Sequence, residues 1–222
     1  MARIGRDRIV LHEPLPPPRL AEQTMGMPAT KRWTTEEVRA LMDENRPTPR
    51  YELIDGELLV SFDSAEPDVT NAPTIEHQRA VRELLRVLDA HLSADMGEAL
   101  SAPADLELEP GSIVQPDVFV MAAGAAGLPR SWAEVSGLLL AIEVLSPSTA
   151  RYDRVVKRHF YQRVGVAEYW VVDVSSRVIE RWHAEDERPE VVDGSITWHP
   201  AGVAEPLVLD LETFFARVHA ED

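Results

Sequence analysis

The chain has 222 residues, of which 45% are hydrophobic and 27% charged, and its formal net charge is −16. This length and composition are typical of one globular domain with a sizeable core. No stretch approaches the ~20 consecutive apolar residues that cross a bilayer, and the absence of cysteine excludes disulfides and thiolate metal sites.

The first thirty residues differ from the rest of the chain. Residues 1–30 carry five prolines and no sustained hydrophobic period, which predicts a flexible proline-rich arm. The arm is basic but lacks the apolar run of a signal peptide, so the expected compartment is the cytoplasm. Residues 31–222 are predicted to form a single domain.

The domain is predicted to begin with a helix and a hairpin. Thr34 and Glu37 have the spacing of a capping box, which marks the start of a helix. Asp55-Gly56 lies between two β-prone runs and predicts a hairpin with a type I′ turn. A longer helix should cover residues 74–92. Its apolar side chains recur at spacings of three and four and form one face, consisting of Val81, Leu84, Leu85, Leu88 and Leu92.

Three strands are predicted in the middle of the chain, at about 105–108, 114–121 and 138–145. The last of these is a nearly unbroken apolar run, which is typical of a central strand buried on both faces. A helix should follow Ser148 and end near Gly165, a natural residue for a left-handed cap.

The C-terminal part continues the sheet. Residues 169–174 predict another buried strand, and 177–183 a strand that follows it through a short turn. Short strands are predicted at Val191 and 196–198, and a terminal helix at 211–219. The elements together predict an α/β fold, with a mixed sheet flanked by helices on both faces.

Two carboxylates interrupt apolar strands. Asp117 opens one strand directly after a proline, and Glu143 lies near the end of the central apolar run, where burial without a partner is expensive. On neighbouring strands these two groups could share a divalent cation, which would offset their burial and mutual repulsion. Oxygen ligands without cysteine or paired histidines favour Mg²⁺ or Mn²⁺ over Zn²⁺. Such a site suits metal-assisted phosphodiester hydrolysis.

The helix after Glu143 is locally basic. Residues 151–163 hold five Lys or Arg against one Asp. Asp153, Lys157 and Tyr161 recur every four residues and share a face, so the Lys157 ammonium could reach back to hold water or stabilise transition-state charge. A basic stripe beside that face, able to border a metal site, is predicted from Arg151, Arg154 and Arg158.

Each of these residues has a plainer interpretation. Asp153 and Lys157 could be an exposed i,i+4 pair worth only ~0.3–0.5 kcal/mol. Asp117 could be a strand-start carboxylate bonded to local amides. Glu143 calls for a partner under either interpretation, because its run is so apolar. His77 falls on the apolar face of a helix and is interpreted as a core residue rather than a ligand.

Several motifs occur together over residues 33–215. They are Tyr51-Glu-Leu-Ile-Asp-Gly-Glu, Pro116-Asp117, Glu143-Val-Leu-Ser-Pro-Ser-Thr, Asp153-x-x-x-Lys157 and Gly165-Val-x-Glu-Tyr-Trp-Val-Val-Asp173. In combination they resemble the Uma-type family of putative restriction endonucleases, which belongs to the PD-(D/E)XK nuclease superfamily. The resemblance implies a restriction-endonuclease-like fold, a mixed β-sheet flanked by helices with an N-terminal helix and β-hairpin.

The resemblance also implies roles for individual residues. Asp117 and Glu143 would be the metal-binding carboxylates, and the backbone carbonyl of Val144 a further metal contact. The superfamily's lysine two residues after the second carboxylate is here Leu145. In similar sequences a lysine on the following helix replaces it, and Lys157 fits that position.

Glu52 matches an acidic position near the N-terminus of the family. It would be an additional metal or water contact, and an ordinary hairpin carboxylate is the alternative. The site residues predicted from the sequence are therefore Asp117, Glu143, Lys157 and Glu52, with the Val144 carbonyl.

The predicted function is divalent-metal-dependent endonucleolytic hydrolysis of DNA, with DNA as the partner and without membrane association. A homodimer would let two sites cut both strands. The net charge of −16 opposes this prediction, because acidic surfaces repel phosphates at long range. Two alternatives stay open. One is a catalytically inactive binding or scaffold protein with the same fold, and the other is a metal-dependent phosphohydrolase acting on a small substrate.

Overall fold

The computed structural model describes most of the domain predicted for residues 31–222. The chain divides into two units, residues 1–30 and 31–222. The predicted proline-rich arm lies outside the described residues. Those described are 31–42, 50–61, 74–201, 203 and 205–220.

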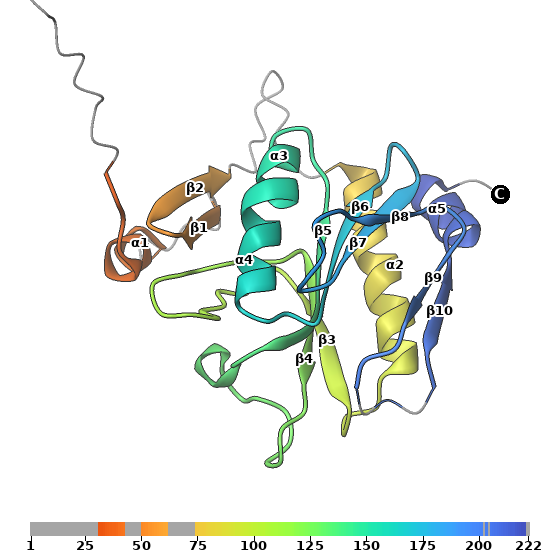
Figure 1. Cartoon of the computed structure of the whole chain (residues 1–222), viewed down its shortest axis with the longest axis horizontal. Helices are drawn as coiled ribbons and strands as arrows, with labels where there is room; N and C mark the ends of the chain where they lie inside the picture. Colours follow the sequence, from red (N-terminus) through yellow and green to blue (C-terminus); the bar gives the residue numbers. More distant parts are fainter. Residues whose placement is uncertain (1–30, 43–49, 62–73, 202, 204, 221–222) are drawn as a thin grey trace, which may run out of the picture. The chain divides into compact units, whose positions relative to one another are not determined.

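A six-stranded mixed sheet forms the centre of the domain (Figure 1), in the order β3-β4-β5-β6-β7-β8. Strands β5 and β6 are parallel, and all other neighbours in this sheet are antiparallel. A parallel pair needs a crossover connection, which the helices between β5 and β6 provide. The strands are β3 (Gly97–Ser101), β4 (Val118–Ala122), β5 (Leu138–Val144), β6 (Glu168–Asp173), β7 (Val178–Trp182) and β8 (Glu190–Val192).

One face of this sheet is covered by α2 (Ile75–His91) and α5 (Leu211–His219). The antiparallel hairpin of β9 (Ser195–Trp198) and β10 (Leu207–Asp210) contributes to the same apolar cluster. Helix α2 begins where the helix over 74–92 was predicted to begin, and the Thr74 hydroxyl caps it by accepting a hydrogen bond from the backbone N–H of His77.

The other face packs against three consecutive helical segments, α3 (Ala150–Tyr152), the π-helix η2 (Asp153–Lys157) and α4 (Arg158–Arg163). Buried Phe160 and Tyr161 anchor them to the sheet. Helix α4 ends at Arg163, close to the predicted end near Gly165, whose positive φ of 78° suits glycine. A short 3₁₀ helix, η1 (Trp132–Glu134), lies between β4 and β5.

A helix, α1 (Thr35–Met42), and a hairpin of β1 (Arg50–Ile54) and β2 (Glu57–Ser61) come before α2. The capping box is confirmed, since Thr34 and Glu37 exchange backbone-to-side-chain hydrogen bonds. The predicted Asp55-Gly56 turn is confirmed by positive φ angles of 51° and 75°. Leu53 of β1 exchanges two backbone hydrogen bonds with Ile113, which brings the hairpin beside the sheet.

The predictions for the strands need two corrections. Residues 105–108 form no strand, because only Leu106 pairs, in a single bridge to Val114. The strand expected at 114–121 begins later, at Val118. Strand β3 was not predicted, since Gly-Glu-Ala-Leu-Ser has neither β-branched residues nor clear alternation.

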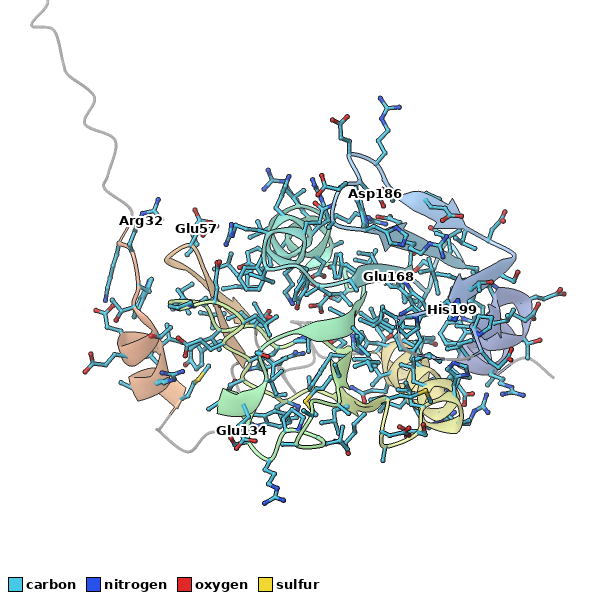
Figure 2. The ribbon with its side chains drawn as sticks, turned by 60° about the horizontal axis from the view of Figure 1, so that its bottom comes forward. Arg32, Glu57, Glu134, Glu168, Asp186 and His199 are labelled. Atoms are coloured by element: carbon cyan, nitrogen blue, oxygen red, sulfur yellow. The ribbon has the colours of Figure 1, made fainter. Side chains whose placement is uncertain are left out.

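The described surface is rich in outward-pointing acidic side chains. Figure 2 shows Glu57 and Glu134 directed away from the ribbon, and both are exposed. No helix in the described ranges is long and apolar enough to cross a membrane.

Candidate active site

The two carboxylates predicted as metal ligands lie on adjacent strands. Strands β4 and β5 pair with Val118 opposite Ile142, so Asp117, just before β4, lies across from Glu143. Residues opposite each other in an antiparallel pair present their side chains on one face. The Val144 backbone N–H donates to Asp117 Oδ2 at 2.9 Å and ties the two strand ends together.

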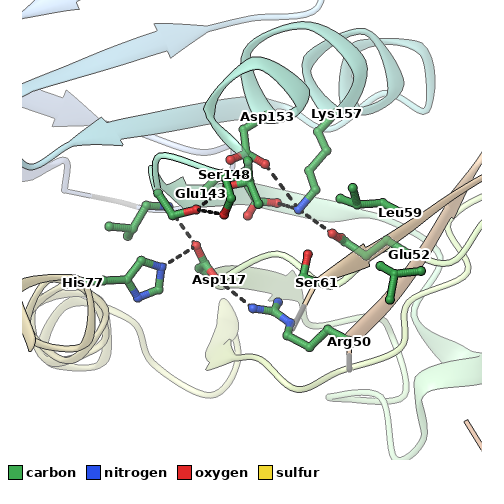
Figure 3. A pocket seen from close by; sticks show the side chains of 14 residues that line it. Arg50, Glu52, Leu59, Ser61, His77, Asp117, Glu143, Ser148, Asp153 and Lys157 are labelled. Carbon is green, nitrogen blue, oxygen red and sulfur yellow. Dashed lines mark hydrogen bonds and ion pairs between the residues drawn. The ribbon is translucent and has the colours of Figure 1, made fainter. Parts of the chain in front are cut away.

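Both carboxylates line one cavity of about 100 Å³ (Figure 3). Its walls come from β1 and β2, the first turn of α2, the ends of β4 and β5, and the segment from Ser146 to Lys157. All the site residues predicted from the sequence line it, namely Glu52, Asp117, Glu143, Val144 and Lys157.

The Lys157 ammonium is buried among three carboxylates. Its Nζ lies 2.9 Å from Glu143 Oε1, 2.9 Å from Glu52 Oε2 and 3.5 Å from Asp153 Oδ1. Burial alone would lower the pKa of Lys157, but these three carboxylates raise it well above its ordinary value. Lys157 is therefore not part of an exposed helix pair, and its ammonium points to the carboxylates rather than to solvent.

Glu143 is held by two donors on the same oxygen. Lys157 Nζ and the Tyr161 hydroxyl, at 3.2 Å, both donate to Oε1. Burial raises the pKa of Glu143 well above its ordinary value, and the neighbouring carboxylates of Asp117 and Asp153 add to the rise against the opposing effect of Lys157. A further cation in the cavity would oppose this rise and favour the ionised carboxylate.

Asp117 has the opposite electrostatic character. Its Oδ2 also faces His77 Nε2 at 3.1 Å, and Arg50 Nη1 lies 3.4 Å from Oδ1. Burial would raise the pKa of Asp117, but hydrogen bonding and charge from His77, followed by Arg50 and Lys157, lower it to about 2. Asp117 is therefore ionised at neutral pH.

The structure changes the interpretation of His77 and adds Arg50. His77 is not a core residue, since its ring lines the cavity and contacts Asp117. His77 lies in the first turn of α2, directly after the Thr74 cap. A side chain in the first turn can extend beyond the end of the helix, and this was a signal in the sequence. Arg50 had no signal in the sequence, because only the folded hairpin brings it to the cavity.

Glu52 is buried rather than an ordinary hairpin carboxylate. Its Oε1 accepts the Gln115 backbone N–H at 2.8 Å, while Oε2 contacts Lys157. Leu145, which stands where the superfamily has lysine, is half-buried against the apolar cluster beneath α4. The residue after β5 is thus apolar, and the cation of the site, Lys157, comes from η2 instead.

The donor set fits a divalent cation. Four carboxylates line the cavity against two permanent cations, Arg50 and Lys157, so negative charge is in excess there when all four carboxylates are ionised. No three His, Asp or Glu side chains in the described part of the chain form a ready-made ligand set. The predicted ligands, however, are two carboxylates and one carbonyl, and Mg²⁺ sites commonly use one or two carboxylates and complete their shell with water.

The predicted basic stripe does not line the cavity. Arg154 contacts Asp173 and Glu180 instead. The Arg158 guanidinium lies 4.8 Å from the centre of the Trp182 ring and donates to Gln162. These two arginines therefore stabilise the protein's own surface rather than a groove beside the carboxylates.

Comparisons with known proteins agree with this architecture. A solved crystal structure of a putative nuclease belonging to DUF820 from Anabaena variabilis matches with a TM-score of 0.60 and 18% sequence identity, over 83% of this chain and 98% of that one. This likeness confirms the predicted fold class. A search of curated proteins found no match. The family model Uma2, described as putative restriction endonuclease, matches residues 35–212, so the chain belongs to this family.

Proposed function

We propose that this chain is a divalent-metal-dependent endonuclease that hydrolyses DNA phosphodiester bonds. Family membership supports a nuclease-like function. The observation that carries the metal dependence is the opposition of Asp117 and Glu143 across β4 and β5, in a cavity lined by four carboxylates and two permanent cations.

The proposed ligands are Asp117, Glu143 and the Val144 carbonyl, which would hold Mg²⁺ or Mn²⁺. The ion would supply Lewis-acid polarisation of the phosphoryl group and would favour ionisation of water. Asp117 is already ionised and oriented by the Val144 N–H and His77. The ligand geometry is therefore prepared before a substrate arrives, which is what electrostatic preorganisation requires.

Lys157 and Glu52 act on Glu143 in this proposal. Lys157 fixes Glu143 Oε1 by a hydrogen bond, and Glu52 fixes Lys157 from the opposite side. Tyr161 donates to the same Glu143 oxygen and limits its rotation. Because both donors bind Oε1, Glu143 Oε2 is the oxygen that would bind the ion.

The test is a cleavage assay on supercoiled, linear and single-stranded DNA with Mg²⁺ or Mn²⁺. Glu143→Gln keeps the shape of the side chain but loses the charge, and activity should fall to background. The control is Glu212→Gln, which removes one negative charge from the exposed surface of α5 and should keep wild-type activity. A wild type that cuts none of these substrates with either ion would contradict the proposal and favour the inactive scaffold.

A second candidate function is supported by the charges. The net charge of −16 and the internal contacts of Arg154 and Arg158 weaken long-range attraction of DNA. A small phosphodiester depends less on such attraction. Turnover of bis(p-nitrophenyl) phosphate without any cleavage of DNA would select this candidate.

If both strands of DNA are cut together, a homodimer is expected, and light scattering after size-exclusion chromatography would detect it.

A further inference from the structure

The Lys157 ammonium is enclosed by carboxylates. An ammonium has three N–H groups, and Nζ of Lys157 has three carboxylate neighbours, Glu52, Glu143 and Asp153. Its side chain is only 4% exposed. A phosphate that approached this buried ammonium would compete with three carboxylates for it. Lys157 is therefore a positioning residue in this arrangement.

Arg50 is the other permanent cation of the cavity, and its side chain is 24% exposed. Its Nε–H donates to Gln115 Oε1 at 3.2 Å, and Nη2 donates to the Gln115 carbonyl at 2.7 Å. The contact from Nη1 to Asp117 is 3.4 Å, longer than the ~2.7–3.2 Å of an ordinary N–H···O bond. Of the five N–H groups of a guanidinium, two have no acceptor among the described residues.

The guanidinium is also held rigidly. Gln115, which takes two of its hydrogen bonds, is itself buried and fixed by three contacts. Its backbone N–H donates to Glu52 Oε1 at 2.8 Å, and its side-chain amide donates to Asp105 at 2.6 Å and to the Tyr51 carbonyl at 3.5 Å. A fixed guanidinium loses little side-chain entropy when it binds an anion. Arg50 is thus preorganised at the wall of a cavity lined by four carboxylates.

We propose that Arg50 is the phosphate-binding residue of this cavity, and that its two remaining N–H groups donate to a non-bridging oxygen of the substrate phosphodiester. A phosphodiester adds a negative charge to an acidic cavity, so it needs a cation with free donors. Arg50 meets this requirement, whereas the Lys157 ammonium is buried and already paired with carboxylates. The inference rests on the proposed function and names the residue that recognises the anion.

The test measures DNA binding against salt concentration, with Ca²⁺ in place of Mg²⁺ to limit turnover. Each phosphate contact contributes about 0.9 to the slope of log affinity against log salt on duplex DNA. Arg50→Gln should weaken binding and reduce the slope by about 0.9. Arg50→Lys should weaken binding but keep the slope. The matched control is Arg130→Gln, an exposed arginine that does not line the cavity, and its slope should equal that of wild type.

A second measurement follows DNA binding by the wild type itself and needs the Arg50→Lys variant only to assign one resonance. The Arg50 Nε–H resonance, identified by its absence from the Arg50→Lys spectrum, should shift when DNA is added, whereas that of Arg130 should not. An unchanged Arg50 resonance and an unchanged slope for Arg50→Gln, with DNA still bound by wild type, would overturn the inference. Failure of wild type to bind or cut DNA would instead reject the proposed function.

Discussion

The two faces of the central sheet are stabilised in different ways. The face under α2 and α5 is filled with apolar side chains such as Leu84, Leu88 and Phe214, none of which is more than 2% exposed. The face under α4 has similar packing around Phe160, but at one end it buries four carboxylates and Lys157. Burial of apolar side chains stabilises the fold without any charged partner. Buried charges destabilise it unless each has a partner of opposite charge.

Replacing Lys157 by methionine should produce the largest loss of stability. The variant keeps the volume but leaves Glu52, Glu143 and Asp153 without their common cation. Breaking a buried ion pair from one side typically costs about 3–5 kcal/mol, and urea denaturation at pH 7 would measure it. Because the unpaired carboxylates acquire raised pKa values, they favour the folded state at low pH, and the variant should regain stability as pH falls.

Leu84→Ala on the opposite face is the comparison for that experiment. It removes buried apolar volume and should cost about 2–5 kcal/mol. No ionisable group changes its surroundings, so this loss should stay constant with pH. A similar pH dependence in both variants would show that the two faces do not differ as described.

The second prediction concerns Mg²⁺ and pH. The raised pKa of Glu143 means that its contribution to stability is present below its ordinary pKa of 4.5 and is lost as pH rises above it. Mg²⁺ requires the ionised carboxylate, so its stabilising effect should grow over the same rise in pH. When the Mg²⁺ concentration is a hundred times Kd, the stabilisation by Mg²⁺ amounts to about 2.7 kcal/mol and should be visible as a moderate increase in Tm.

Asp117→Asn should abolish this response to Mg²⁺, because it removes the ligand that is ionised throughout this range. The exposed substitution Glu212→Gln should leave the response intact. If the asparagine variant is stabilised as strongly as wild type, the ion binds elsewhere on the acidic surface.

The smallest effect is expected for Arg154→Gln. Arg154 contacts Asp173 and Glu180 at the surface, where ion pairs contribute about 0–1 kcal/mol. Thermal denaturation should show a change of that size, and the salt dependence of DNA binding should be unaffected. If Arg154→Gln reduces the slope of log affinity against log salt as much as Arg50→Gln does, Arg154 contacts DNA and the predicted basic stripe is correct.

Much of the fold could be predicted from local patterns. The Thr74 cap, the Asp55-Gly56 turn and the 3.6-residue period of α2 are all signals within one element. The strands were harder to predict, because β3 becomes a strand only by pairing with β4. Pairing depends on residues far apart in sequence, which a single local window does not contain.

The same distinction applies to the site. Asp117 and Glu143 stood out because a carboxylate in an apolar strand needs a partner. Arg50 and His77 could not be assigned to the cavity, because they reach Asp117 across separations of 67 and 40 residues. The role of Arg158 was also misjudged, since an arginine on a helix gives no sign that it will stack on Trp182.

The π-helix of Asp153–Lys157 makes the spacing of this segment intolerant of length change. Its wider turn is closed by a hydrogen bond from the Arg158 N–H to the Asp153 carbonyl, which also accepts from the Tyr169 hydroxyl at 3.0 Å. Deleting one residue to restore a regular helix would rotate everything after it by about 100°. Tyr161 would then leave Glu143. Homologous chains that keep the site should therefore accept substitutions in this segment far more readily than insertions or deletions.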